Sequence, residues 1–238
     1  MLAIIDETAR GGQLRSSAIW GSMRGAIAED GMLKIWGRTT SSNVQKVLWC
    51  CAELNIEYDR VDHGGPFGGN RDPEYLKLNP NGLVPTVIDG DLVMWESNTI
   101  CRYLCNTRPN GERLYPRDPA ARTHVERWMD WQLSVIGPPM GGLLQGLIRS
   151  TPETRDPAAI EGARRRAITA WEIVDDAVAN QPYLAGQALS LAEIVLGTQI
   201  YRWFTFPIER PHMAHLRIWY ERFCERPGFK QAIVMPIT

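Results

Sequence analysis

The sequence predicts a first half that mixes strands and helices, followed by an all-helical second half, an α+β arrangement. Short apolar-alternating stretches occur only before residue 109, whereas the patterned segments after residue 119 repeat at helical spacing. The 238 residues are enough for two modest domains, each with its own core. We expect a domain at residues 32–108, a linker rich in Pro, Gly and charge at 109–119, and a helical domain at 120–238.

Residues 1–31 differ in pattern from the rest of the chain. Gly and Ser punctuate them without a sustained period, so we interpret them as a flexible or loosely docked extension. Met32 opens the first strongly patterned segment.

The first strand is predicted at residues 33–36, where apolar residues alternate and a Gly follows. Small polar residues at 39–43 favour a turn and a helix cap. Apolar residues at helical spacing from 44 to 54 predict the first amphipathic helix. A second strand is expected at 56–61, and the Gly-rich segment 63–70 is expected to be a loop.

A short helical turn is predicted at residues 74–78, ended by the Asn-Pro-Asn-Gly run at 79–82. Two further strands, at 84–88 and 92–95, are joined by an Asp-Gly-Asp turn, which is a good hairpin signal. A helix at 97–105 completes the first half. The predicted order is therefore β-α-β-α-β-β-α, with a parallel start and an antiparallel hairpin at the end.

The second half is predicted to contain long helices. The first runs from residue 121 to 136, is broken or kinked by Gly-Pro-Pro at 137–139 and resumes through 148. Further helices are expected at 158–180, 190–203 and 212–224, with a last short turn from 227.

Composition excludes several function classes. The net charge of −1 gives no overall attraction to nucleic acid or to an anionic membrane, and the basic run at 164–166 fits a solvated helix face. No apolar run approaches the roughly 20 residues that span a bilayer, and the N-terminus lacks the order of a secretory signal. The partners we expect are neither nucleic acid nor membrane.

The 5 cysteines are odd in number and form no CxxC motif, which argues against a disulfide scaffold or a dithiol redox site. They fall in apolar helical patterns, so we expect buried, reduced thiols and a reducing compartment. The histidines are not spaced with the cysteines as ligands, and no metal is expected.

Two features beside the hairpin could bind a ligand. Pro85, near the start of a predicted strand, has no N–H to donate to a neighbouring strand. If the Val84–Pro85 bond is cis, the N–H and C=O of Val84 would face outward and could bind an extended peptide. The plainer reading is a trans proline at a strand start. Glu96 and Ser97 begin the next helix, where free N–H groups attract a carboxylate and Glu96 attracts an ammonium, although such a pair can also be a simple cap.

Ser41, Ser42 and Asn43 form a third feature, between the first strand and the first helix. Their hydroxyl and amide donors, with the helix N-terminus behind them, could hydrogen-bond a thiolate and lower the pKa of the parent thiol. The alternative is that they only cap the helix. No His lies near in sequence, and a hydrolase triad is unsupported.

The order of these features resembles the soluble, cytosolic glutathione transferase family, in its bacterial type with a Ser/Asn first-turn motif. The resemblance extends from Met32 to about Phe229. Its most specific parts are residues 79–86 (NPNGLVPT) and 95–100 (WESNTI). Residues 190–193 (SLAE) are similar to the family's capping box in the helical half. The resemblance implies a thioredoxin-like domain at 32–108 followed by a helical bundle.

The resemblance also implies roles for single residues. Val84 would pair its backbone with the cysteinyl part of glutathione, and Pro85 would be the family's cis-proline. Glu96 and Ser97 would hold the γ-glutamyl end. Ser42, four residues before a lysine, would stabilise the thiolate; a neighbouring bacterial class points instead to Ser41 and Asn43.

Many members of the family hold the glycyl carboxylate with a basic residue where this chain has Gly82 and Leu83. Lys77, Arg71 or the loop at 63–70 could take over that contact. A second-substrate pocket is expected near Trp128 and Met140, although these side chains could equally be plain core.

The expected activity is that of a cytoplasmic, homodimeric glutathione S-transferase of the detoxification type. Glutathione would be the co-substrate, no metal would be needed, and the thiolate would attack a small hydrophobic electrophile. One alternative is a glutathione-dependent disulfide reductase, peroxidase or isomerase on the same fold. Another is a non-catalytic glutathione-binding protein.

Overall fold

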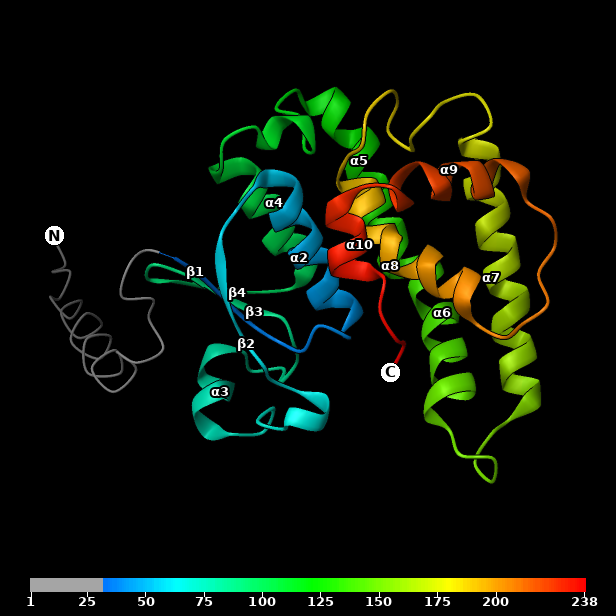
Figure 1. Ribbon diagram of the computed structural model, residues 1–238, viewed down its shortest axis with the longest axis horizontal. Coiled ribbons are helices and arrows are strands. Elements are labelled where there is room, and N and C mark those ends of the chain that lie inside the picture. Colours follow the sequence, from blue (N-terminus) through cyan, green and yellow to red (C-terminus); the bar gives the residue numbers. More distant parts are fainter. Residues whose placement is uncertain (1–31) are drawn as a thin grey trace, which may run out of the picture.

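The computed structural model describes residues 32–238, and the interpretation of residues 1–31 lies outside it. The first half contains a four-stranded sheet with helices on both of its faces (Figure 1). The elements are β1 (Leu33–Trp36), α2 (Ser42–Leu54), β2 (Tyr58–Val61), α3 (Pro73–Leu78), β3 (Thr86–Asp89), β4 (Leu92–Trp95) and α4 (Ser97–Thr107), with 3₁₀ turns at Gly65–Phe67 and Gly111–Arg113. Helix α3 lies on the opposite side of the sheet from α2 and α4.

The sheet has the strand order β2-β1-β3-β4. β1 pairs parallel with β2 and antiparallel with β3, and β3 pairs antiparallel with β4. This is the predicted parallel start with a hairpin end. β3 begins at Thr86 rather than at residue 84, because Pro85 has no N–H to donate to a neighbouring strand.

The second half contains α5 (Pro119–Trp131), α6 (Gly137–Leu144), α7 (Pro157–Ala177), α8 (Leu191–Thr205), α9 (Ala214–Cys224) and α10 (Pro227–Ile233). The break expected at residues 137–139 is a change of helical register. The π-helical segments η3 (Gln132–Ile136) and η4 (Gln145–Arg149) flank α6, and the Gly137 N–H donates to the Gln132 carbonyl, five residues back. Because Pro138 and Pro139 have no N–H, the widened turn lets the helix continue without their hydrogen bonds.

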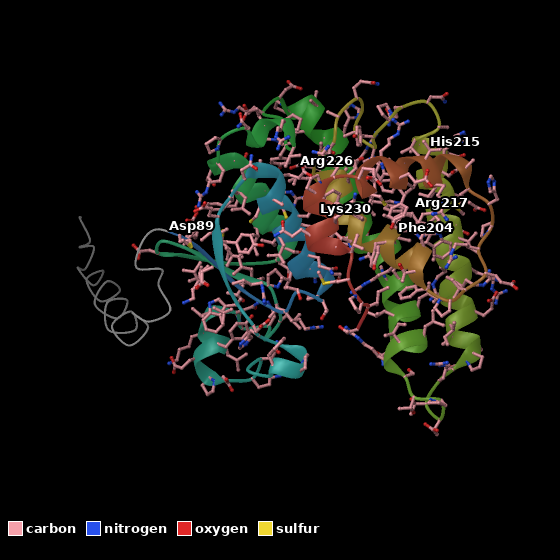
Figure 2. The ribbon with its side chains drawn as sticks, viewed as in Figure 1. Asp89, Phe204, His215, Arg217, Arg226 and Lys230 are labelled. Carbon is pink, nitrogen blue, oxygen red and sulfur yellow. The ribbon has the colours of Figure 1, made fainter. Side chains whose placement is uncertain are left out.

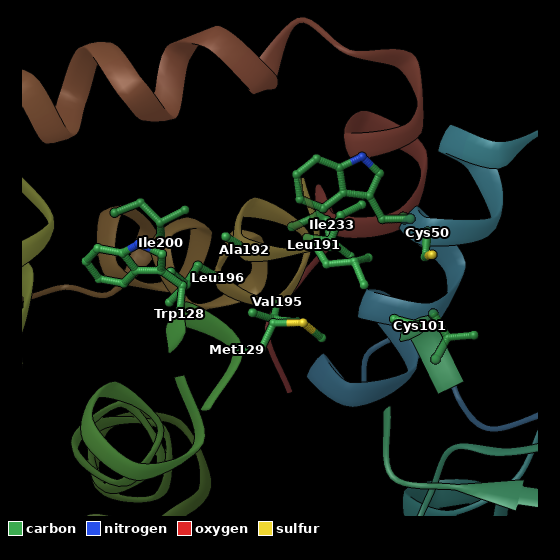
Figure 3. Packing of buried hydrophobic residues seen from close by; sticks show 14 of the residues in the cluster. Cys50, Cys101, Trp128, Met129, Leu191, Ala192, Val195, Leu196, Ile200 and Ile233 are labelled. Atoms are coloured by element: carbon green, nitrogen blue, oxygen red, sulfur yellow. The ribbon is translucent and has the colours of Figure 1, made fainter. Parts of the chain in front are cut away.

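Helix α8 lies at the centre of the structure and joins the two halves. Its residues from Leu191 to Ile200 are all buried, and they pack against α5 on one side and α2 on the other (Figure 3). Gly197 permits the contact with α2, because a Cβ at this position would lie 2.4 Å from Cζ3 of the buried Trp49 ring. The sheet is therefore held in a fixed position beside the helical half.

Two polar contacts reinforce this packing. Arg226, at the start of α10 (Figure 2), donates from Nε to Oε1 of Glu53 on α2 at 2.8 Å and from a terminal nitrogen to Oε2 at 2.5 Å. The predicted capping box of α8 is confirmed: the Ser190 hydroxyl accepts from the Ala192 N–H, and Glu193 accepts from the Ser190 N–H at 3.0 Å. Glu193 is fully buried and accepts further bonds from the Leu184 N–H and the Trp219 Nε1–H.

The prediction of buried, reduced thiols is confirmed for Cys50, Cys51, Cys101 and Cys105, and Cys224 is also free but partly exposed. The Sγ atoms of Cys50 and Cys105 are 4.0 Å apart. Hydrogen bonding with Cys101 and Cys105, together with burial, raises the pKa of the Cys50 thiol. The Cys50 thiol is therefore part of the hydrophobic core and is not a reactive nucleophile.

Candidate functional site

A cavity of about 410 Å³ lies between the two halves of the protein. One wall comes from the turn after β1, the start of α2 and the loops before α3 and β3; the other comes from η3, α6, η4 and α8. The lining residues are Arg38, Ser41, Ser42, Asn43, Asn70, Leu83, Val84, Gln132, Leu133, Gly137, Gly141, Leu144, Arg149, Gln199 and Arg202. The structure thus brings the first-turn residues and Val84 together at one cavity.

The first-turn residues lie at the start of α2 and at the edge of the cavity. Ser41 is the N-cap residue, yet its side chain makes no capping hydrogen bond. Ser41 is buried, Ser42 is half-buried and Asn43 is exposed, and all three line the cavity. Since their polar groups stand at the N-terminal end of α2, the partial positive charge of the helix favours an anion there.

The Val84–Pro85 peptide bond is cis, and Val84 lines the cavity. The carbonyl oxygen of Leu83, one residue earlier, accepts hydrogen bonds from the Tyr75 hydroxyl at 2.6 Å and from the Asn79 amide at 2.8 Å. These two contacts hold the segment before β3 against α3.

Ser97 contacts the first turn, and neither Ser97 nor Glu96 is among the residues that line the cavity. The Ser97 hydroxyl donates to the Asn43 side-chain oxygen at 3.3 Å, which joins the start of α4 to the start of α2. Glu96 has a φ of 70°, a conformation that costs a residue with a side chain about 1–3 kcal/mol and that persists at binding sites. Its side chain is exposed, whereas that of Ser97 is buried.

A buried lysine lies behind the first turn. Lys46 is fully buried, and its Nζ donates to the side-chain oxygens of Gln132 at 2.6 Å and Asn98 at 3.2 Å. Burial lowers the pKa of Lys46 to about 8, against the opposing influence of Cys101 and Glu96. The cation thus links α2, α4 and η3, and Gln132 connects it to the cavity wall.

Trp128 and Met140 do not line this cavity. Trp128 packs against α8 in the core (Figure 3), where its Nε1–H donates to the Leu184 carbonyl at 3.2 Å, and Met140 is almost completely buried. The same helical segments present Leu133 and Leu144 to the cavity instead.

Lys77, Arg71 and the loop at 63–70 were the candidates to bind the glycyl carboxylate in place of a basic residue at Gly82 or Leu83. The structure puts them in different places. Lys77 is paired with Glu74 at 2.5 Å and does not line the cavity. The His63 ring is buried against Tyr75, with ring centroids 3.9 Å apart. Asn70 lines the cavity and donates to the Gly82 carbonyl at 2.6 Å. A Cβ added to Gly82 would lie 3.4 Å from a terminal nitrogen of Arg71, which places Arg71 beside the same segment.

Sequence reasoning missed Gln132, Gln199 and three arginines of the cavity wall. One signal was Arg202, a charged residue in the mostly apolar helix α8. Among residues 32–238, no group of three or more His, Cys, Asp or Glu side chains is placed to hold a metal ion. In the same part of the chain, no helix is both long and apolar enough to cross a bilayer.

Comparison with known proteins identifies the family. Residues 40–107 match the family model of the glutathione S-transferase N-terminal domain. Glutathione S-transferase GstB of Escherichia coli (strain K12) is 35% identical over 209 residues, which are 87% of this chain and 100% of that protein. The chain belongs to the glutathione S-transferase family.

Solved structures agree with this assignment. The theta class glutathione S-transferase of Xanthomonas axonopodis pv. citri, with glutathione bound, superposes with a TM-score of 0.84 and 43% sequence identity, covering 87% of this chain and 100% of that one. The present chain therefore has the predicted thioredoxin-like half followed by a helical half. As a member of this family, it uses glutathione as its co-substrate.

Proposed function

We propose that this transferase ionises the thiol of glutathione in the cavity and directs the thiolate to an electrophilic carbon of a small co-substrate. The proton leaves to solvent, a carbon–sulfur bond forms, and the electron pair of the broken bond departs with the leaving group. The observation that carries the proposal is that Ser41, Ser42 and Asn43 share one cavity with Val84, while Asn43 is hydrogen-bonded to Ser97.

We assign the parts of glutathione along this wall. The Val84 backbone pairs with the cysteinyl residue beside Pro85, and Glu96 and Ser97 hold the γ-glutamyl end at the start of α4. This assignment is supported by the unusual backbone of Glu96 and by the Ser97–Asn43 contact. Arg71 takes the glycyl carboxylate, because it lies beside Gly82.

Ser42 is our choice for the hydrogen-bond donor to the thiolate, with Asn43 and Ser41 as the alternatives. A hydrogen bond to a charged acceptor contributes about 1.5–3 kcal/mol. Since one pKa unit is about 1.4 kcal/mol, one such bond lowers the pKa of the bound thiol by roughly 1–2 units from its ordinary value near 8.5.

The apolar part of the co-substrate is expected against Leu133 and Leu144, where Gly137 and Gly141 leave room. We also propose that the enzyme is a cytoplasmic homodimer, in which the first half of one subunit lies against the helices of the other. Light scattering should then give twice the mass of the 26.9 kDa chain, and a monomeric mass would contradict it.

The test uses Ser42→Ala, Ser41→Ala and Asn43→Ala, with Ser134→Ala as the control. Ser134 is exposed on η3 and bonds only its own helix, at the Asp130 carbonyl. The thiolate absorbance of bound glutathione is followed against pH, glutathione affinity is measured by calorimetry, and turnover is measured with an aryl halide.

In Ser42→Ala the pKa of bound glutathione should rise by about 1–2 units. Turnover at neutral pH should fall at least tenfold, and glutathione affinity should stay within about threefold of the parent. Unchanged titration and turnover in all three variants would remove the first turn from the mechanism. Activity toward mixed disulfides or hydroperoxides, without activity toward any aryl halide, would favour the reductase alternative. Binding without any turnover would favour the non-catalytic alternative.

A further inference from the structure

Three arginines from separate elements line the same cavity. Arg38 follows β1, Arg149 ends η4, and Arg202 lies on α8. The chain as a whole carries a net charge of −1, so its overall composition does not account for this local concentration of positive charge.

None of these arginines is paired with an acidic side chain. Within residues 32–238, the nitrogen–oxygen pairs closer than 4.0 Å between basic and acidic side chains include none of the three. Burial, followed by the charges of Arg149 and Arg38, lowers the pKa of Arg202 to about 10. Burial and Arg149 also lower the pKa of Arg38. The three guanidinium groups therefore repel one another across the cavity.

The three arginines differ in burial: Arg202 is buried, Arg38 is half-buried and Arg149 is exposed. Arg202 is only 6% exposed, and within residues 32–238 the one hydrogen bond of its side chain is a long one of 3.4 Å to the Thr40 carbonyl. Arg149 donates to the main-chain oxygen of Thr238, the last residue of the sequence, at 3.1 Å. The Arg38 side chain lies against Gly65, whose added Cβ would come within 2.9 Å of its Cδ. A guanidinium carries five N–H donors, so the nearly buried Arg202 keeps donors for an anion brought by a ligand, and the half-buried Arg38 and the exposed Arg149 line the same cavity.

We propose that Arg202, with Arg38 and Arg149, binds a carboxylate carried by the electrophilic co-substrate. This inference rests on the proposed function and defines its substrate class: an apolar body with one anionic group. Arg149 and Arg202 stand on the helical wall, which also carries Leu133 and Leu144, where the co-substrate is assigned. The glutathione carboxylates are assigned to the opposite wall, at Ser97 and near Gly82.

Planar guanidinium groups bind a carboxylate through two parallel hydrogen bonds, which also fixes its orientation. A carboxylate held on the helical wall would direct the reactive carbon of the co-substrate toward the first turn of α2. The same arginines would reduce the repulsion between the anionic co-substrate and the glutathione thiolate.

The test compares a chloronitrobenzoate with the corresponding chloronitrobenzamide, two aryl halides that differ in charge. Each rate is divided by its uncatalysed rate with free glutathione, because the two rings differ in intrinsic reactivity. The variants are Arg202→Gln, Arg38→Gln and Arg149→Gln. Arg222→Gln is the control, since Arg222 is exposed on α9 and does not line the cavity. Because Arg202 is buried, Arg38→Gln and Arg149→Gln keep the test valid if Arg202→Gln fails to fold.

The parent enzyme should prefer the benzoate, and Arg202→Gln should lower kcat/KM for it by about 10-fold to 100-fold. The benzamide rate and the glutathione affinity should change by less than about threefold, and Arg222→Gln should change neither. Equal losses for both aryl halides with weakened glutathione binding would overturn the proposal and assign the arginines to a glutathione carboxylate. An unchanged benzoate preference in every variant would also overturn it.

A binding measurement tests the anion site independently of whether the enzyme turns over either aryl halide. Calorimetry with glutathione present is repeated with nitrobenzoate and nitrobenzamide, which lack the leaving chloride. Binding of nitrobenzoate that depends on Arg202 or Arg38 supports the anion site even if the enzyme turns over neither aryl halide. Equal affinity for the two compounds in the parent protein overturns the anion site, whatever the turnover.

Discussion

The buried charge of Lys46 gives the protein a pH dependence of stability that can be calculated from the structure. Its Nζ is enclosed by the neutral oxygens of Asn98 and Gln132, and burial lowers its pKa from 10.5 to about 8. The difference of about 2.5 units corresponds to about 3 kcal/mol at 1.36 kcal/mol per unit. Below pH 8 this amount is a cost, because folding then buries a charged ammonium.

The sign follows from proton binding. Between pH 8 and 10.5 the unfolded chain keeps the Lys46 proton while the folded protein has lost it, so the free energy of unfolding rises with pH. The rise is small below pH 8 and is complete above 10.5. From pH 7 to pH 10 this one group should therefore add about 2 kcal/mol to the stability of the parent protein.

The assay is urea unfolding of the parent and of Lys46→Met at pH 7 and at pH 10. Other titrating groups affect both proteins alike, so the parent should gain about 2 kcal/mol relative to the variant over this range. Lys77→Met, which removes an exposed lysine, controls for the loss of one surface charge. If the difference in the free energy of unfolding between the parent and Lys46→Met stayed constant or shrank with rising pH, the reasoning would be refuted. Lys46 would then not be a buried charge.

Two substitutions in α8 test the packing that positions the cavity. Glu193→Ala removes the acceptor for the Leu184, Ser190 and Trp219 N–H groups, so the free energy of unfolding should fall by about 3–6 kcal/mol in urea unfolding. Glu193→Gln should lower the free energy of unfolding by less than Glu193→Ala. A decrease below about 1 kcal/mol in Glu193→Ala would contradict the role of this capping box. Gly197→Ala places a Cβ 2.4 Å from the Trp49 ring and should lower stability by about 1–3 kcal/mol in thermal unfolding. Gly162→Ala, a helical glycine whose added Cβ would meet only a flexible arginine at 3.5 Å, should be neutral or stabilising; equal effects of the two would count against tight packing at Gly197.

The sequence predicted the order of the helices and strands, because the signals for each element lie close together in the sequence. The apolar spacing of α2, the Asp-Gly turn between β3 and β4, and the Ser190–Glu193 box are signals within a few residues. The Gly-Pro-Pro run predicted an interruption of the helix but not its form. The helix continues through π-helical segments on either side of α6, and α6 itself packs against the distant α7.

The cavity wall could not be predicted in the same way. Leu133 and Leu144 line the cavity whereas Trp128 and Met140 lie in the core, and only the packing of α5 and α6 against α8 decides which of these apolar side chains meets the cavity. Arg202 meets Thr40 across 162 positions of sequence, a contact that no local spacing encodes. Sequence could therefore indicate the side of the cavity proposed for glutathione, whose motifs are local, but not the cavity arginines Arg38, Arg149 and Arg202.

The most direct test of this account is a calorimetric titration of the full chain with glutathione, repeated with Ser97→Ala. The account predicts saturable heat with one site per chain. It also predicts an affinity at least tenfold weaker in the variant, because it assigns the γ-glutamyl carboxylate to Ser97 at the start of α4. If the parent protein gave no heat at millimolar glutathione, or if Ser97→Ala bound it as tightly, the assigned glutathione site would be wrong.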